Sequence, residues 1–580
     1  MTMRIVLDIE TNLAHDKIHV VVTKDIDTGE VKLWKAADNL REYLKDVSLI
    51  IGHNVIGFDA PVLNRCWKTK IRLNQVYDTL IVSRLLDPSR ENGHSLEAWG
   101  QTLGFHKIDY AKVWTWLMDR NEEYRGESFD LPHHGLLDDY CVRDVEVTAK
   151  LYLKLVNDLK EKQFSQESVD LEHRVAAIIS EQERNGFKLD QIYTTCLLTD
   201  IKSKVAGIYE RMQQRWPPVT VERFSDKTGK RLKDSVVTFN PGSRQQIGEK
   251  LKELGWKPKE FTETGLPKID ETVLAGVKIP EAQVIAEYLM LQKRISQIES
   301  WMEAVGKDGR VHGKVITNGA VTGRCTHSSP NLAQIPNTSS MYGAECRACW
   351  TVEEDRVLVG CDLSGIELRC LSHYMQDEEW QRELLEGDVH WKNTQAFGLV
   401  PMGTSKEDTQ EHKDARNLSK TLTYSVLYGA GATKVGMTVG GTAKQGAKLI
   451  DNFLNNTPSL KKLKAKVDKL SAKGYVPALD GRKVWVRSEH AALNSLLQSA
   501  GAIIAKQWIV CLTDNLRAAK IDYKLLAFVH DEVCIETFGK DAEKVVDIVV
   551  KSAKQAGEIL GLRCPVSAEG HIGKTWADVH

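Results

Sequence analysis

The chain of 580 residues is long enough for several domains rather than one hydrophobic core. Its composition, 42% hydrophobic and 27% charged, is that of an ordinary globular protein, and its net charge of −1 argues against a generally basic, histone-like protein. Any nucleic acid would therefore bind through local basic patches.

The eleven cysteines are scattered along the chain. The close pair Cys346 and Cys349 has no second pair at zinc spacing, which favours reduced structural thiols over a zinc site. The first residues, Met1 to Asp8, enter an apolar strand with no signal peptide before it. No window reaches the apolar length that a bilayer requires, so we expect a cytoplasmic protein without membrane contact.

Acidic residues mark three segments of the first 150 residues. Asp8 and Glu10 lie on one face of the first predicted strand, because side chains alternate with a period of two. Asp59 follows a second apolar strand, at the start of a predicted helix. Tyr140 and Asp144 lie one turn apart on a third segment, which is predicted to be helical. Taken singly, each acid would be an ordinary surface charge.

Together and in this order, the three motifs resemble the DEDD-type 3′–5′ exonucleases that carry tyrosine in the third motif. The resemblance implies an RNase H-like domain over residues 1–160 and two divalent ions, held by Asp8, Glu10, Asp59 and Asp144. Tyr140 would orient the attacking water. Four carboxylates offset two dications, of which one generates hydroxide and the other stabilises the leaving 3′ oxygen. Because no member of the set is missing, we expect an active nuclease.

From about residue 165 the pattern changes to long amphipathic helices, for example over residues 171–186 and 279–301. A polar, glycine-punctuated loop follows, with Arg324 in it and Gln334 shortly after it. Such a loop suits contacts with a nucleic-acid backbone and minor groove, although a plain connector is the alternative. Next, Asp362 ends an apolar strand that turns into a helix bearing Glu367.

A helix is also predicted over residues 415–429, where glycine stops it. Arg416, Lys420, Tyr424 and Tyr428 recur every four residues and form one slowly drifting stripe. Two cations followed by two aromatic rings fit a nucleoside triphosphate laid along the helix, with the cations on its phosphates. A solvated amphipathic helix is the alternative, which the unusually apolar remainder of the helix disfavours.

The last motif is a predicted β-hairpin whose tight turn carries His530, Asp531 and Glu532. Carboxylates at such a turn cannot build a core, because burial of an unpaired charge is costly. They could hold a divalent cation. Asp362 and Asp531, two acids at strand ends far apart in sequence, are what a two-metal phosphoryl-transfer site requires. By itself the turn would be an ordinary polar turn.

In order, these segments resemble the three polymerase motifs of DNA polymerase family A behind an exonuclease domain, and they are most similar to the replicative polymerases of T-seven-like podophages. The shared segments are Thr322 to Arg324, Asn331 to Pro336, Gly387 to His390, Leu479 to Val484, His490 to Asn494, Leu497 to Ala502 and the terminal His580. The resemblance implies a multidomain α/β and α+β fold, with a right-hand polymerase over residues 161–580. Its parts would be a thumb at about 165–315, a palm at about 316–385 and 490–580, and fingers at about 386–489.

The resemblance also implies the roles of the site residues. Two Mg²⁺ ions per active site, replaceable by Mn²⁺, would be held in the polymerase by Asp362, Asp531 and the carbonyl of Leu363. The incoming nucleotide would contact Glu367, His390, Arg416, Lys420 and Tyr424. Lys420 would also serve as the acid for the leaving group. Glu367 would fill the space that a ribose 2′-hydroxyl needs. Primer and template would contact Arg324, Gln334, Tyr428, Gln498, His530 and Glu532.

The expected function is thus that of a replicative DNA-dependent DNA polymerase with proofreading, encoded by a bacteriophage and acting in the host cytoplasm. Its partners would be primer–template DNA, dNTPs and a replisome helicase–primase. The T-seven-like group binds host thioredoxin through a long thumb insertion, and Trp216 to Phe239 is too short for it, so we expect thioredoxin not to be a partner. Two alternatives remain, a repair polymerase and a nuclease whose second half is only a DNA-binding scaffold.

Overall fold

The computed structural model describes residues 3–119, 135–225 and 227–580. The chain forms two compact units. The first unit comprises Met1–Asn185, Lys314–Ser328 and Asp355–Ile572, and the second comprises Gly186–Gly313, Ser329–Glu354 and Gly573–His580. Each unit is described in turn below.

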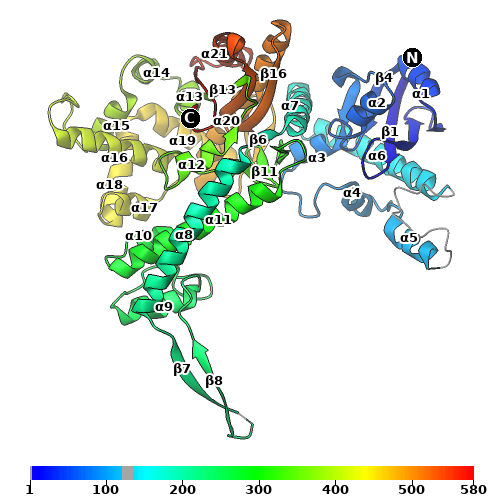
Figure 1. Cartoon of the computed structure of the whole chain (residues 1–580). Helices are drawn as coiled ribbons and strands as arrows, with labels where there is room; N and C mark the ends of the chain where they lie inside the picture. Colours follow the sequence, from blue (N-terminus) through cyan, green and yellow to red (C-terminus); the bar gives the residue numbers. More distant parts are fainter. Residues whose placement is uncertain (1–2, 120–134, 226) are drawn as a thin grey trace. The chain divides into compact units, whose positions relative to one another are not determined.

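The amino-terminal part of the first unit is built on a five-stranded sheet of order β3-β2-β1-β4-β5 (Figure 1). Its strands are β1 (Met3–Thr11), β2 (Ile18–Asp25), β3 (Val31–Trp34), β4 (Val47–Gly52) and β5 (Val76–Asp78). The pairs β1–β4 and β4–β5 are parallel, and the other pairs are antiparallel. The helices of this part are α1 (Ala37–Tyr43), α2 (Asp59–Cys66), α3 (Thr79–Leu86), α4 (Leu96–Thr102), α5 (Tyr110–Met118) and α6 (Leu136–Glu161).

Helices cover both faces of the central strand β1, so apolar residues of the strand pack on each side. Ile5 and Leu7 pack in one cluster with Leu40 of α1, whereas Val6 packs in another with Val145 of α6. Side chains of a strand alternate between faces, so the even-numbered residues of β1 face α6. This alternation directs the two acids that follow Val6 toward the same helix.

The carboxy-terminal part of the first unit contains a four-stranded sheet of order β16-β17-β13-β18. Its strands are β13 (Arg356–Leu363), β16 (Tyr523–Val529), β17 (Glu532–Phe538) and β18 (Ala568–Gly573). The helices α7 (Gln166–Asn185), α13 (Ile366–Met375), α20 (Ala492–Ala518) and α21 (Ala542–Ile559) share one hydrophobic core with it. Two small ribbons complete this part, β10–β11 (Lys314–Ile316, Thr326–Ser328) and β14–β15 (Tyr475–Pro477, Lys483–Trp485).

A helical segment of the same unit joins α13 to β14. It consists of α14 (Glu378–Leu385), α15 (Val389–Phe397), α16 (Gln410–Leu427), α17 (Ala432–Thr438), α18 (Ala443–Asn456) and α19 (Pro458–Ser471). Side-chain caps start several of these helices: the hydroxyl of Thr409 accepts from the backbone N–H of His412, and the carboxylate of Asp388 from that of Trp391. Short 3₁₀ helices in the whole chain are η1 (Leu44–Asp46), η2 (Leu73–Gln75), η4 (Leu332–Gln334), η5 (Glu489–Ala491) and η6 (Gly539–Asp541).

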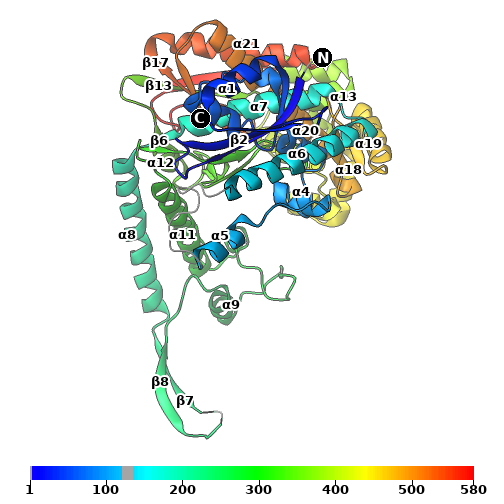
Figure 2. The same ribbon diagram turned by 90° about the vertical axis from the view of Figure 1, so that its right-hand side faces the viewer.

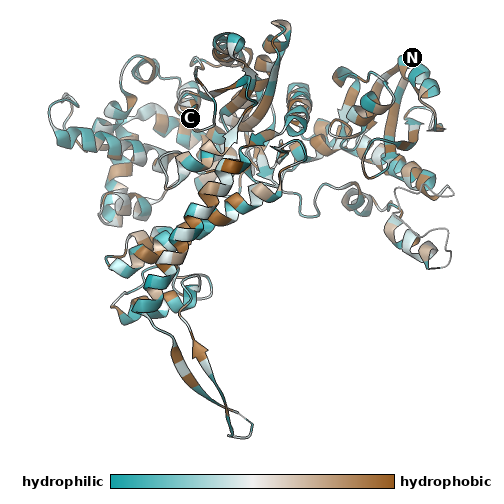
Figure 3. Ribbon diagram, in the orientation of Figure 1, coloured by the Kyte–Doolittle hydropathy of each residue, from teal (hydrophilic) through white to brown (hydrophobic). Residues whose placement is uncertain are grey.

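The second unit has two long packed helices, α8 (Gln191–Arg215) and α11 (Pro280–Glu303), with the shorter α9 (Arg244–Glu253), α10 (Glu271–Ala275) and α12 (Gly343–Ala348). A small sheet joins β6 (Phe187–Leu189), β9 (Arg310–Val311) and β12 (Trp350–Thr351). The hairpin of β7 (Val219–Phe224) and β8 (Arg231–Val237) extends beyond the end of α8 (Figure 2). Hydrophobic residues recur along this hairpin although both of its faces are exposed (Figure 3).

The predicted strands and helices that carry the motifs are confirmed, and the eleven cysteines are free thiols, with Cys346 and Cys349 buried. The expectation that no window of the sequence is long and apolar enough to cross a bilayer is wrong. Within the described residues, α20 is long and apolar enough to cross a membrane, with a mean hydropathy of 1.3. However, 89% of its apolar window is buried inside the protein, because α20 packs in the hydrophobic core of the carboxy-terminal part of the first unit.

Candidate metal centres

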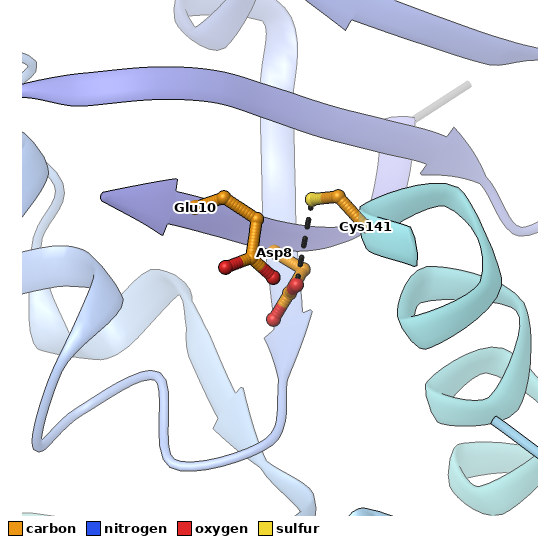
Figure 4. Close-up of side chains that lie close together, drawn as sticks. All are labelled: Asp8, Glu10 and Cys141. Atoms are coloured by element: carbon orange, nitrogen blue, oxygen red, sulfur yellow. Dashed lines mark hydrogen bonds between the residues drawn. The ribbon is translucent and has the colours of Figure 1, made fainter. Parts of the chain in front are cut away.

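The first centre lies between β1 and α6 of the first unit. Asp8 and Glu10 project from β1 toward Cys141 near the start of α6, and ligand atoms of the three residues lie within 4.8 Å of one another (Figure 4). The thiol of Cys141 donates to Oδ2 of Asp8 at 3.4 Å. Asp59, the first residue of α2, is buried beside β1, where its Oδ1 accepts from the backbone N–H of Ile9 at 3.2 Å.

Asp144 completes a cluster of four acids. Burial and the neighbouring acids raise the pKa of Asp8 well above its ordinary value and that of Glu10 to about 8. Burial raises the pKa of Asp59 to about 7 and that of Asp144 to about 6. The cluster therefore resists full ionisation unless a cation offsets its charge. Buried carboxylate oxygens, including an Oδ1 of Asp144 without a hydrogen-bond partner among the described residues, suit a hard divalent cation such as Mg²⁺.

The structure brings two further side chains to this centre that the sequence pattern did not reveal. The ammonium of Lys107, between α4 and α5, lies 2.5 Å from Oδ2 of Asp144 and donates to the hydroxyl of Tyr140 at 2.9 Å. Lys107 stands in a connecting loop without periodicity, so no pattern could assign it. The position of Cys141 next to Tyr140 in the sequence could have indicated that it lies at this centre. A cysteine in a helix, however, usually packs as a small apolar residue.

The second centre lies at the end of the four-stranded sheet. Residue 362 on β13 pairs with residue 532 on β17, and the backbone N–H of Leu363 donates to the carbonyl of Asp531 at 3.0 Å. Asp362 and Asp531 are therefore neighbours across two antiparallel strands. Burial, aided by the charge of Asp362, raises the pKa of Asp531. This pair of carboxylates with the carbonyl of Leu363 offers oxygen ligands of the kind that Mg²⁺ prefers.

The turn between β16 and β17 shapes this centre. His530 has a left-handed backbone with φ of 57°, which makes the tight reversal possible. Burial, and next the nearby charge of Arg324, lower the pKa of His530. Glu532 is buried, with 8% of its surface exposed, and its carboxylate accepts from the thiol of Cys534 at 3.8 Å. It is thus more enclosed than a residue of an exposed turn.

Glu367 on α13 connects this centre with two other segments. Its Oε1 lies 3.3 Å from Nη2 of Arg324, and its Oε2 accepts from the hydroxyl of Tyr428, the C-cap residue that follows α16. The predicted nucleotide and DNA contacts Glu367, Arg324 and Tyr428 therefore lie together beside Asp531 in the first unit.

Arg416 of the stripe contacts the N-cap of α15. Nε of Arg416 donates to Oδ2 of Asp388 at 2.7 Å, and Lys406 also reaches this oxygen, at 2.9 Å. Although burial opposes it, these two bonds lower the pKa of Asp388 to about 2. Burial, and next the charges of Arg416 and Lys420, lower the pKa of His390, so these three basic groups gather at one place.

The remaining predicted contacts with nucleotide or DNA are half-buried or exposed. Tyr424 is half-buried, with its ring centre 6.4 Å from that of His390 and 6.1 Å from that of Tyr428. Gln498 is half-buried on α20. Gln334 belongs to the second unit, where it ends η4 and is exposed.

Comparison with known proteins identifies relatives over the whole chain. The family model "DNA polymerase family A" matches residues 220–578. The DNA-directed DNA polymerases of Enterobacteria phage T3 and Escherichia phage T7 are each 32% identical to this chain, over 99% of it and 100% of their own length. DNA polymerase I of Aquifex aeolicus is 26% identical, over 98% of this chain and 95% of that protein.

Among solved structures, the POL domain of Pol1 from M. smegmatis, in complex with DNA primer-template and dNTP, matches with a TM-score of 0.76 at 18% identity. The match covers 99% of this chain and 96% of that one. This likeness confirms the predicted fold class, an RNase H-like domain followed by a right-hand arrangement of thumb, palm and fingers.

Proposed function

Because this chain belongs to DNA polymerase family A, we propose that it is the replicative DNA-directed DNA polymerase of a bacteriophage and that it proofreads with its own 3′–5′ exonuclease. The observation that carries the proposal is the presence of two separate carboxylate centres, one built on β1 and α6 and the other on β13 and β17. Primer–template DNA and dNTPs are its substrates, and a replisome helicase–primase in the host cytoplasm is its partner.

In the polymerase centre, Asp362, Asp531 and the carbonyl of Leu363 would hold two Mg²⁺ ions, which Mn²⁺ can replace. Ions bound there would lower the pKa of the primer 3′-hydroxyl and neutralise charge on the triphosphate. The close pairing of β13 with β17 supports this assignment, because it brings the two carboxylates to one sheet end.

The residues around this pair bind the substrates. His390, Arg416 and Lys420 bind the phosphates, and Lys420 donates a proton to the leaving pyrophosphate. Tyr424 faces the sugar, and Glu367 fills the space beside its 2′ carbon. Primer and template contact Arg324, Gln334, Tyr428, Gln498, His530 and Glu532, partly in the minor groove, where correct pairs all present acceptors.

In the nuclease centre, Asp8, Glu10, Asp59 and Asp144 would hold two divalent ions. Ions bound there would activate water and would stabilise charge on the leaving 3′ oxygen. Tyr140 orients the attacking water. The raised pKa values of the four acids support the assignment, since such a cluster gains most from a bound cation.

We assign residues 1–160 to the nuclease and residues 161–580 to the polymerase, with the thumb, palm and fingers bounded as the sequence predicts. These assignments do not coincide with the two compact units: the first unit holds residues 1–160 and most of the residues assigned to the palm, whereas residues 329–354 and 573–580 of that assignment belong to the second unit.

Paired substitutions test the proposal. Asp531→Ala should abolish primer extension and leave digestion of a single-stranded 3′ end intact, and Asp8→Ala should do the reverse. Glu543→Ala, an exposed acid in the first turn of α21, should leave both activities unchanged. If the wild-type chain digests DNA but never extends a primer, the alternative holds that its second half is only a DNA-binding scaffold. Loss of both activities by either substitution would contradict two independent centres.

A further inference from the structure

Lys107 is enclosed in the nuclease centre. Only 18% of its side chain is exposed, although it comes from a connecting loop. Its ammonium contacts Asp144 at 2.5 Å and Tyr140 at 2.9 Å, and it lies 4.7 Å from the ring centre of Tyr140. Its charge acts on Asp8 and Glu10 as well. Burial of an ammonium is costly unless it is paired, so these contacts hold the side chain in place.

The contact with Tyr140 fixes the direction of the phenol. An ammonium has only donors, so the oxygen of Tyr140 must accept from it. The O–H of Tyr140 then remains a donor and is directed away from Lys107. A water or phosphate oxygen at the centre is the acceptor that this geometry leaves for it.

The contact with Asp144 fixes the carboxylate in the same way. Lys107 occupies Oδ2, and Oδ1 is buried without a hydrogen-bond partner among the described residues. Tyr140 and Asp144 lie one turn apart on α6, so a single ammonium from outside the helix holds both.

We propose that Lys107 is a positioning residue of the exonuclease, which orients the Tyr140 hydroxyl and the Asp144 carboxylate for attack of water on the terminal phosphodiester. The proposal rests on the nuclease function proposed above. Because Lys107 acts through two other side chains, its removal should slow cleavage without weakening the binding of DNA or metal.

Three variants test this role. Lys107→Met keeps most of the length of the side chain and removes its charge, and Lys107→Arg restores a cation. Lys112→Met removes an exposed lysine of α5 as a matched control. The substrate is a 3′-labelled single-stranded oligonucleotide at saturating Mg²⁺. For Lys107→Met we expect kcat to fall ~100-fold, because misplaced reacting groups carry a cost of this size, with KM changed less than about twofold. Lys107→Arg should recover most of the rate, and Lys112→Met all of it.

A second measurement separates positioning from structural damage. Mn²⁺ binding to the nuclease centre is measured by electron paramagnetic resonance in an Asp531→Ala background, which removes an acid of the other centre. Lys107→Met should bind Mn²⁺ as tightly as its parent or more tightly, since a neighbouring cation opposes a second one. Extension of a matched primer by Lys107→Met, in the chain with Asp531 intact, should equal that of the wild type.

The outcomes are distinct. Unchanged kcat in Lys107→Met, while Asp8→Ala abolishes digestion, would overturn the role of Lys107 and leave the nuclease proposal standing. Weaker Mn²⁺ binding together with slower cleavage, or failure of Lys107→Arg to recover, would also overturn it, because either result indicates lost packing. A wild-type chain that leaves the oligonucleotide intact would overturn both proposals.

Discussion

The hydroxyl of Tyr428, where α16 ends, donates a hydrogen bond to the carboxylate of Glu367 in the first turn of α13. The other oxygen of this carboxylate lies 3.3 Å from Nη2 of Arg324. One acid thereby links three segments that are far apart in sequence. It stands beside Asp531. Burial is the main cause that raises the pKa of Asp531, and the charges of Asp362 and Glu367 raise it further. Glu367 is thus held in one place at the centre where a nucleotide sugar would bind.

This placement predicts how the polymerase would select deoxyribose. If Glu367 has its proposed role, removal of its side chain would open the space that a 2′-hydroxyl needs. We expect Glu367→Ala to raise the ratio of ribonucleotide to deoxynucleotide incorporation by roughly 10- to 100-fold, measured as kcat/KM in single-nucleotide primer extension. Tyr428→Phe, which keeps the carboxylate, should retain the wild-type ratio. An unchanged ratio in Glu367→Ala would show that another group excludes ribose.

Tyr424 predicts acceptance of chain terminators. In the proposed site its hydroxyl would face the sugar and would supply the hydrogen bond that a dideoxynucleotide loses with its 3′-hydroxyl. We expect the wild type to incorporate dideoxynucleotides and Tyr424→Phe to discriminate against them ~100-fold more strongly, in gel-based extension with mixed substrates. Tyr209→Phe, on an exposed part of α8, is the control. Equal termination by wild type and Tyr424→Phe would argue against this role.

The acid cluster predicts how pH affects the metal-free chain. The pKa of Glu10 rises from 4.5 to about 8 on folding, so between these values the unfolded chain has lost a proton that the folded chain retains. This contribution to stability is therefore present below pH ~4.5 and is lost as the pH rises through about 8. In chelator, the thermal midpoint of the wild type should fall more steeply with pH than that of Glu10→Gln.

The pH dependence of the thermal midpoint can be checked with added Mg²⁺. The ion should raise the thermal midpoint of the wild type more at pH 8 than at pH 6, because fewer bound protons then compete with it. Parallel slopes for wild type and Glu10→Gln in chelator would show that the carboxyl of Glu10 titrates normally.

The thumb segment predicts independence from thioredoxin. Residues 216–239 form only the exposed hairpin β7–β8 and its flanks, among the residues described there. We expect the product length on a long primed template to be unchanged by added thioredoxin, with serum albumin as the control protein. A large gain in product length that thioredoxin produces and albumin does not would refute this prediction.

A buried charge cluster predicts a large loss of stability. Glu172 of α7 is fully buried, and its Oε1 lies 2.6 Å from both Arg482 and Lys506. Glu172→Ala leaves two buried cations short of a partner, so we expect a loss of about 3–5 kcal/mol in urea unfolding. Glu558→Ala, which removes an exposed ion pair with Lys554, should change stability by less than about 0.5 kcal/mol. Similar effects of the two substitutions would contradict the prediction.

The sequence by itself determined the strands and helices and the positions on them at which the acids lie. Alternation along β1 put Asp8 and Glu10 on one face, and the apolar runs around His530 predicted the hairpin that carries Asp531. These features are readable because the direction of a side chain follows from the local period of its strand or helix. The family motifs then predicted which acids share a metal centre.

The tertiary structure alone decided which distant side chains meet. It brought Lys107 to Tyr140 and Asp144, joined Asp388 to Arg416, and buried the apolar helix α20, which by composition alone could cross a membrane. No local period encodes these contacts, because they depend on how whole elements pack. A lysine in a loop and an acid in a nuclease motif lie 37 residues apart, and only the packing of the fold brings their charges together.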